Sequence, residues 1–369
     1  MKEKNLKKRG GSVLLKRILL LFTIVSMLSV CRLEGSAKSQ DLNDFTDIKT
    51  VSKYEGKKLC VGGTAFGVKF FTKGVLVVGI SSMKSQGKDV NPAHDAGIRV
   101  RDIIISVNGK EVDSVKEISE IIAASKGEAV KIILVRDRKE REATLIPKLD
   151  DKEQIYKGGM WLRDSTAGIG TVTYIEPKTG EFGGLGHGIC DIDTGELMPL
   201  KRGSAMKVEI GGVVKGKQGK PGEIKGYFLP ERCGSVMSNT VCGVFGVFSE
   251  LPRSLSEPID ICLRDELKEG KAEIICTLGN DGPKTYTVEI SKIDRDGTDN
   301  KNFVVKVTDE KLIERTGGIV QGMSGSPIIQ NGKLAGAVTH VLVNDPTRGY
   351  GIFIENMLDA SRTPIPKAA

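Results

Sequence analysis

The sequence predicts a mostly β protein with an N-terminal export or anchor segment, a smaller α+β domain and a larger domain built as a β-barrel or a pair of barrels. The chain has 45 glycines among 369 residues and only 5% aromatic residues. This balance favours turn-rich β structure, because glycine supplies the positive-φ positions of hairpins and bulges. One capped amphipathic helix occurs within 62–149, and from 150 to 360 short β-prone runs alternate with glycine or proline.

Residues 1–37 form the expected export segment. Seven basic residues between Lys2 and Arg17 precede an apolar stretch from Ile18 to Val30. The length of this stretch suits a signal-peptide core better than a full membrane span. Gly35-Ser36-Ala37 is a plausible cleavage site, and both a cleaved signal and a retained membrane anchor stay open. We expect residues 38–61 to be a linker and 361–369 an extended tail.

The net charge of +8 does not indicate a nucleic-acid-binding protein. Basic residues crowd the export segment, and elsewhere both signs are interspersed without a basic stripe or an aromatic stacking motif. The seven cysteines form no CxxC pair and the chain has three histidines, so the spacing of a zinc site is missing. We expect no nucleic-acid partner, no metal and no cofactor, and we expect the cysteines to be free, buried thiols.

Residues 62–149 predict a compact α+β unit. Asp102 to Val107 has the pattern of a strand and leads into an Asn108-Gly109 hairpin turn. Ser114-Val115-Lys116-Glu117 is a capping box, and it opens a helix whose apolar residues, Val115 among them, share one face. A strand from Val130 to Val135 and a partner near Ala143 complete the unit.

The segment Asn91 to Ile98, followed by Arg101 to Ile104 and Asn108-Gly109, resembles a PDZ domain of the kind attached to exported bacterial proteases. The resemblance implies that a peptide adds as a strand beside Phe66-Gly67-Val68 and packs against the helix at Val115. Arg101 stands where such domains often carry glycine. A PDZ-shaped spacer that binds nothing is the alternative.

Residues 317–327, Gly-Gly-Ile-Val-Gln-Gly-Met-Ser-Gly-Ser-Pro, place a serine in a glycine-framed turn between apolar runs, as chymotrypsin-like folds do. A serine nucleophile needs a general base and amide donors for the oxyanion. Gly322 lies two residues before Ser324, so the amides of these two residues can converge on one carbonyl oxygen. Ser326 is the competing nucleophile, but Pro327 restricts its backbone to extended conformations.

Three histidines compete for the role of base. His187 lies in a glycine-rich loop of the β-rich region, His94 belongs to the PDZ-like unit, and His340 lies in a strand after the nucleophile, where it is structural or lines the cleft. We favour His187. The orienting acid is open between Asp309, at the end of a strand, and two residues close to His187: Asp191 and Asp193. The order His187, Asp309, Ser324 is that of chymotrypsin-like proteases.

Thr308-Asp309-Glu310, the segment Thr316 to Lys333 and the segment Gly336 to Val341 resemble the SpoIVB peptidase family, and the likeness extends over nearly the whole chain. The resemblance implies a catalytic triad of His187, Asp309 and Ser324 in a chymotrypsin-like double barrel. We expect the strand at Val338, Thr339 and His340 to pair with the substrate backbone.

This family resemblance also implies a biological role. The protein would be a sporulation-specific serine endopeptidase, exported from the forespore into the space between the forespore and mother-cell membranes. It would cleave itself and a membrane-anchored regulator of an intramembrane metalloprotease, leading to activation of the late mother-cell sigma factor. A non-catalytic PDZ-based scaffold is the rival hypothesis, and a cysteine hydrolase using Cys190 is a more distant one.

Overall fold

The structure is a computed structural model that describes residues 52–252 and 255–362. The expected export segment and most of the expected tail lie outside the described residues. Within the described part, no helix combines the length and the apolar character needed to cross a lipid bilayer.

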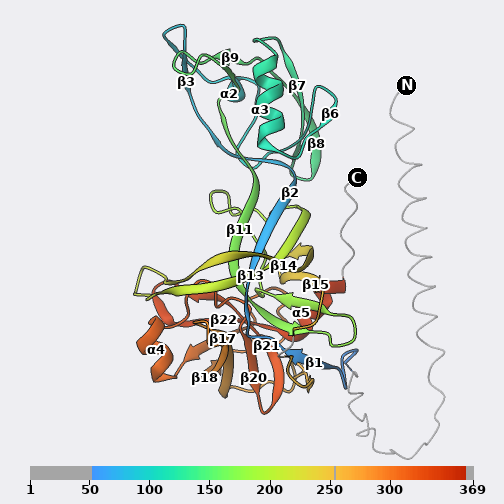
Figure 1. The fold of residues 1–369 in the computed structure, drawn as a ribbon, viewed down its shortest axis with the longest axis vertical. Helices are drawn as coiled ribbons and strands as arrows, with labels where there is room; N and C mark the ends of the chain where they lie inside the picture. The colour runs from blue at the N-terminus through green and yellow to red at the C-terminus, as the bar shows by residue number, and fades with distance from the viewer. Residues whose placement is uncertain (1–51, 253–254, 363–369) are drawn as a thin grey trace, which may run out of the picture. The chain divides into compact units, whose positions relative to one another are not determined.

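The first barrel, barrel 1, is a ring of six antiparallel strands in the order β11-β12-β15-β14-β13-β2, closed by pairing between β11 and β2 (Figure 1). Its strands are β2 (Ala65–Ile80), β11 (Met160–Ile175), β12 (Glu181–Gly184), β13 (Leu200–Val214), β14 (Glu223–Thr240) and β15 (Gly243–Phe248). Two short strands, β1 (Lys58–Val61) and β16 (Ile259–Asp260), pair with each other at its side, and β1 also pairs with β11.

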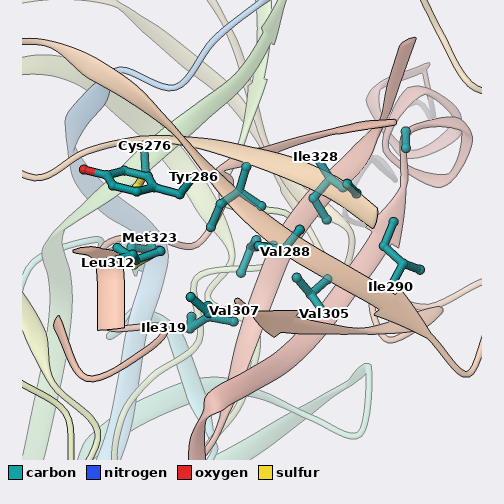
Figure 2. Close-up of a cluster of buried hydrophobic side chains, with 14 of the residues drawn as sticks. Cys276, Tyr286, Val288, Ile290, Val305, Val307, Leu312, Ile319, Met323 and Ile328 are labelled. Atoms are coloured by element: carbon teal, nitrogen blue, oxygen red, sulfur yellow. The ribbon is translucent and has the colours of Figure 1, made fainter. Parts of the chain in front are cut away.

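Barrel 2 is a second closed ring of six strands in the order β17-β18-β19-β22-β21-β20. Its elements are β17 (Gly270–Thr277), β18 (Pro283–Ser291), β19 (Phe303–Val307), β20 (Pro327–Gln330), β21 (Lys333–Leu342), β22 (Asp345–Phe353), helix α4 (Glu310–Thr316) and helix α5 (Ile354–Arg362). Alternate residues of β18 and β19 point inward, and Figure 2 shows Val288, Ile290, Val305 and Val307 converging with Ile328. The two closed rings confirm the mostly β, double-barrel fold.

A PDZ-like unit lies between β2 and β11 in the chain. It contains β3 (Met83–Ser85), β4 (Lys88–Val90), α2 (Pro92–Asp95), β5 (Ile103–Val107), β6 (Lys110–Glu111), α3 (Val115–Ala124), β7 (Val130–Arg136), β8 (Lys139–Leu145), β9 (Lys148–Leu149) and β10 (Tyr156–Lys157). The predicted cap is present, since Ser114 Oγ accepts a hydrogen bond from the Glu117 amide at 3.1 Å. The core of the unit includes Val75, Ile104, Ile118 and Ile132, all fully buried.

The expected linear order of domains needs correction. β2 and β11 each run through both units: Ala65 to Thr72 pair with strands of barrel 1, whereas Val75 and Leu76 pair with β5 of the PDZ-like unit. The PDZ-like unit is therefore an insertion into a long β-hairpin of barrel 1. Protease residues lie both before and after it in the sequence. Part of the expected linker is also folded, since Tyr54 is 2% exposed and β1 extends the sheet.

Candidate active site

Ser324 lies in a tight loop between α4 and β20, and this loop leaves two amides free. Gly322 and Gly325 adopt φ values of 97° and 93°, which non-glycine residues rarely tolerate. The amide of Met323 donates to Val320 O at 3.0 Å and that of Gly325 to Val338 O at 2.7 Å. The amides of Gly322 and Ser324, in contrast, donate to no group in the described part of the chain. Two unpaired donors flanking a serine provide what a developing oxyanion requires.

The two serines of this loop have different environments. Ser326 is fully buried and its hydroxyl donates to Met323 O at 2.6 Å, so it holds the loop together. Ser324 is only partly buried, and its hydroxyl donates to Thr339 O at 2.7 Å. Ser324 is accordingly the accessible candidate nucleophile, but its hydroxyl must turn away from Thr339 to reach a base. Catalytic hydrogen bonds often tighten only once substrate is bound.

His187 follows β12 of barrel 1, directly after a segment that meets the serine loop of barrel 2. The chain approaches closely there: a side chain at Gly186 would press on Thr339, and one at Gly325 would collide with the backbone of Leu185. His187 Nδ1 lies 2.8 Å from Gly188 O. Because a carbonyl oxygen can only accept, Nδ1 carries the proton and donates, which leaves Nε2 of the neutral ring free to act as a base.

The second histidine at this junction is His340 of β21, whose ring centroid lies 4.6 Å from that of His187. Its Nδ1 is buried without a hydrogen-bond partner in the described part of the chain. Burial, followed by the charges of His187 and Lys301, lowers the pKa of His340 to about 4. Burial also lowers the pKa of His187, which the hydrogen bond to Gly188 partly opposes. Both rings are therefore neutral at pH 7, as a general base must be.

The structure does not bring Asp309 to His187, which corrects the expected triad. Asp309 is the N-cap of α4, and its carboxylate accepts a hydrogen bond from the Leu312 amide at 2.9 Å. Its other oxygen lies 3.5 Å from the Thr287 amide, and it forms no ion pair with a histidine of the described chain. An aspartate that ends a strand and precedes a helix satisfies the free amides of that helix, and this local preference decides its orientation here. The carbonyl oxygen of Gly188, and not a carboxylate, accepts the hydrogen bond from His187 Nδ1.

Asp191 and Asp193 do not contact His187 either, but they anchor the loop that follows it. Both carboxylates bind Arg163 of β11, and the Asp191 side chain is 0% exposed. Although burial alone would raise the pKa of Asp191, hydrogen bonds from Thr194 and the Arg163 guanidinium hold it below its ordinary value. Arg101 of the PDZ-like unit also donates to Thr194 O at 3.0 Å. We name residues 190–197, the loop held by these two arginines, the clasp loop.

Two residues that position the histidine loop, Arg163 and Asn239, were not predicted from the sequence. Asn239 of β14 accepts from the Ile189 amide at 2.8 Å and donates to Ile189 O at 2.9 Å. Neither residue lies near His187 in the sequence, and no motif marks them. Only the closure of barrel 1 places them beside the loop.

The strand expected to pair with substrate has a free edge. β20 accompanies β21 only as far as Ala337, while β22 covers the opposite edge as far as Leu342. From Thr339 to Leu342, the edge on the side of Ser324 has no partner strand in the described part of the chain. A peptide can add there by β-augmentation.

The expected PDZ groove needs correction. Phe66, Gly67 and Val68 pair with β11, and Gly67 and Val68 also pair with β13, so this segment lies inside barrel 1 and not at a free sheet edge. Val115 does begin the helix of the unit and packs on its core. The strands beside α3 are β10 and the first part of β11, where Asp164 accepts a hydrogen bond from the Val115 amide at 2.9 Å. A peptide groove of the usual kind would lie between α3 and Met160–Arg163.

The cysteines are unpaired throughout the described residues. Four are buried, as expected, but Cys190 is exposed and Cys233 is half-buried, which corrects the expectation for these two. Desolvation of the sulfur and the charge of Glu196 raise the pKa of Cys190. A raised pKa keeps the Cys190 thiol protonated, and only the thiolate is a good nucleophile. No group of three metal-ligating side chains gathers in the part of the chain that the structure describes.

Two family models match this chain. Residues 154–358 match the SpoIVB peptidase S55 family, and residues 89–136 match the PDZ domain family. A candidate zinc metalloprotease of Clostridium acetobutylicum is 33% identical over 70 residues, which are 19% of this chain and 21% of that protein. The chain thus spans about a fifth of the length of this curated relative.

Among solved structures, the PDZ domain of an SdrC-like protein from Listeria monocytogenes is 27% identical, with a TM-score of 0.20, over 24% of this chain and 87% of that one. A protease of M. tuberculosis in its active form is 14% identical, with a TM-score of 0.33, over 69% of this chain and 89% of that one. The HtrA-type protease AlgW with a tripeptide is 13% identical, with a TM-score of 0.32, over 52% of this chain and 54% of that one. The family match covers more than half of the chain and includes His187, Ser324 and the free oxyanion amides. The chain therefore belongs to the SpoIVB peptidase S55 family, and it is a serine endopeptidase that carries a PDZ domain.

Proposed function

We propose that this protein is a sporulation-signalling endopeptidase that cleaves itself and a membrane-anchored regulator of an intramembrane metalloprotease, and so leads to activation of the late mother-cell sigma factor. The proposal places the enzyme outside the forespore, between the forespore and mother-cell membranes, where its N-terminal segment delivers it. The observation that carries the enzymatic part is the serine loop, in which Ser324 is accessible and the amides of Gly322 and Ser324 have no partner in the described part of the chain.

The chemistry follows from these groups. Nε2 of neutral His187 takes the proton of Ser324 as Oγ attacks the substrate carbonyl, and the amides of Gly322 and Ser324 bind the oxyanion. Protonated His187 then gives its proton to the leaving amine, and water releases the acyl group by the same steps. Gly188 O fixes the ring by accepting from Nδ1, which is the role usually given to a carboxylate.

A second candidate function has one observation in its favour. The Ser324 hydroxyl donates to Thr339 rather than to His187, which is the arrangement of a resting enzyme or of a protease-like scaffold. The free oxyanion amides favour the enzyme, since a scaffold has no need to keep two backbone donors unpaired.

Self-cleavage tests the proposal. Purified wild-type protein should shorten at its N-terminal side during incubation and should react with a fluorophosphonate probe. Ser324→Ala should stay full length and unlabelled, and Ser326→Ala, which changes the neighbouring buried serine, should retain labelling. A wild-type protein that neither labels nor shortens, even when a candidate membrane regulator is added, would favour the scaffold.

A further inference from the structure

The β13–β14 hairpin of barrel 1 carries most of the excess positive charge of the folded protein. Between Leu200 and Thr240 the sequence has eight lysines and arginines against three glutamates, whereas the chain as a whole is nearly balanced at 55 against 47. The turn of this hairpin, residues 215–222, contains Lys215, Lys217 and Lys220 in a segment without a carboxylate. We name residues 215–222 the basic tip.

The basic tip folds over barrel 2 and lies against the site. The Gly219 amide donates to Val343 O at 2.9 Å, directly after the free edge of β21. The Gly216 amide donates to Thr316 O at 2.7 Å, and Gly222 O accepts from the Gln321 amide at 2.8 Å, one residue before Gly322. The backbone of the basic tip is thus fixed between the serine loop and the end of the strand that binds substrate.

Two lysine ammonium groups of the basic tip are available to a ligand. Lys217 and Lys220 are exposed, their backbones pair with each other at 2.9 Å, and neither has a carboxylate within 4.0 Å in the described part of the chain. The nearby Arg348, in contrast, is already paired with Asp345 at 2.6 Å. Two like charges held side by side without a counter-ion favour an anionic partner.

The direction in which a substrate binds decides which of its residues lie at the basic tip. Thr339 lies beside Ser324, so the scissile bond of a bound peptide lies near Thr339. If the peptide pairs antiparallel with the free edge of β21, the residues before its scissile bond lie along β21 from Thr339 toward Val343. At about 3.3 Å per residue, Val343 lies opposite roughly the fourth or fifth residue before the scissile bond.

We propose that Lys217 and Lys220 bind acidic side chains about four to six residues before the scissile bond, and so select substrates with an acidic segment there. This inference rests on the proposed peptidase function. Each exposed ion pair contributes little, so we expect the two together to change kcat/KM about three- to tenfold, chiefly through KM. The preference should weaken as salt rises from about 0.05 to about 0.5 M, because exposed charges are screened.

A peptide-library digestion tests the inference. Peptides cleaved by the full chain are identified by mass spectrometry, and the frequency of Asp and Glu at each upstream position is compared among variants. Lys217→Gln/Lys220→Gln should lose the acidic preference, and Lys217→Glu/Lys220→Glu should replace it with a basic one. The matched control, Lys139→Gln/Lys271→Gln, neutralises two exposed lysines that form no ion pair with any residue the structure describes. No acidic enrichment with wild type, or enrichment that survives neutralisation of the basic tip, would overturn the proposal.

A binding measurement separates failure of this inference from failure of the proposed function. Ser324→Ala is titrated with two labelled ten-residue peptides rich in valine and threonine, one with Asp-Glu-Asp near its N-terminus and one with Asn-Gln-Asn. Tighter binding of the acidic peptide that disappears with Lys217→Gln/Lys220→Gln supports the inference even if wild type cleaves nothing. Equal binding of both peptides, with lysine-dependent binding to phosphatidylglycerol vesicles instead, would assign the basic tip to a lipid surface and refute the substrate role.

Discussion

Barrel 1 and barrel 2 contribute to the same site in different ways. Barrel 2 supplies Ser324, its oxyanion amides and the substrate strand from one contiguous segment of chain, 317–342. Barrel 1 supplies His187 on a loop whose position depends on Arg163 and Asn239, from two other strands. The candidate nucleophile and the oxyanion amides thus come from one segment of chain, which β11 of barrel 1 also holds, since Thr171 Oγ1 donates to Gly322 O at 2.9 Å. The position of the base depends on long-range closure of barrel 1. Changes at Gly322 should act on chemistry directly, and changes at Arg163 should act through the placement of His187.

The largest effect is expected in barrel 2, at Gly322. Its φ of 97° is strained for any residue with a side chain, and a Cβ there would press on Ile224, so Gly322→Ala should misplace one oxyanion donor. Loss of one such donor typically costs about a hundredfold or more in kcat. Steady-state kinetics with a peptide substrate measures this effect, and Gly332→Ala, in an open turn at a φ of 74°, controls for backbone strain alone. Full activity in Gly322→Ala would mean that the oxyanion is bound elsewhere.

The corresponding test in barrel 1 is Arg163→Ala, which leaves the fully buried Asp191 carboxylate without its cation. Breaking a buried pair costs several kcal/mol, and the partial exposure of Arg163 reduces this to about 1–3 kcal/mol. We expect a lower Tm and a kcat/KM reduced at least tenfold, because the clasp loop follows His187. Arg232→Ala, at an exposed arginine of β14, is the matched control. An Arg163→Ala protein of normal kcat/KM would show that the clasp loop only stabilises the fold.

Substitutions of Asp309 distinguish between two roles of its carboxylate, which are capping α4 and orienting the catalytic histidine. If it caps α4, Asp309→Ala should destabilise the protein by about 1 kcal/mol, whereas Asp309→Asn, an equally good cap, should be nearly neutral. Both variants should keep kcat/KM within about threefold. If Asp309 orients His187 instead, Asp309→Asn should lower kcat by about 10⁴. Denaturant unfolding and kinetics on the two variants decide between these roles.

The smallest expected effect is on the dependence of stability on pH. The pKa of His340 is about 4 in the folded protein and ordinarily near 6.5, so protonation favours the unfolded chain. The stability that depends on neutral His340 is present above pH 6.5 and is lost as pH falls toward 4. His340→Gln should therefore flatten this decline, although His187 contributes in the same direction. Urea unfolding midpoints at pH 7 and pH 5 measure this loss of stability, and His94→Gln, at an exposed histidine, is the control.

The sequence was informative wherever structure is set by neighbouring residues. The glycine-framed serine, the Ser114 cap and the short strands of barrel 2 follow from turn, capping and alternation preferences, and the structure confirms them. Barrel 1 differs, because its strands β2, β11, β13 and β14 are 15 to 18 residues long. The errors concern partners far apart in the chain. Phe66 to Val68 look like a free PDZ strand, but pairing with residues more than 95 positions later places them inside barrel 1. Asp309 has the position of a triad acid in the sequence, but the helix that follows captures its carboxylate.

The insertion of the PDZ-like unit has a consequence for how the chain folds. β2 is synthesised long before β11, and closing so long a loop is entropically unfavourable and slow. The PDZ-like unit contains the outer ends of both strands, with Ile80 opposite Met160 and Leu76 opposite Arg163. Once this unit has folded, the inner ends of β2 and β11 are already adjacent and in register. The PDZ-like unit thus forms the turn of one long hairpin, and we expect it to fold before the barrel that carries His187 closes.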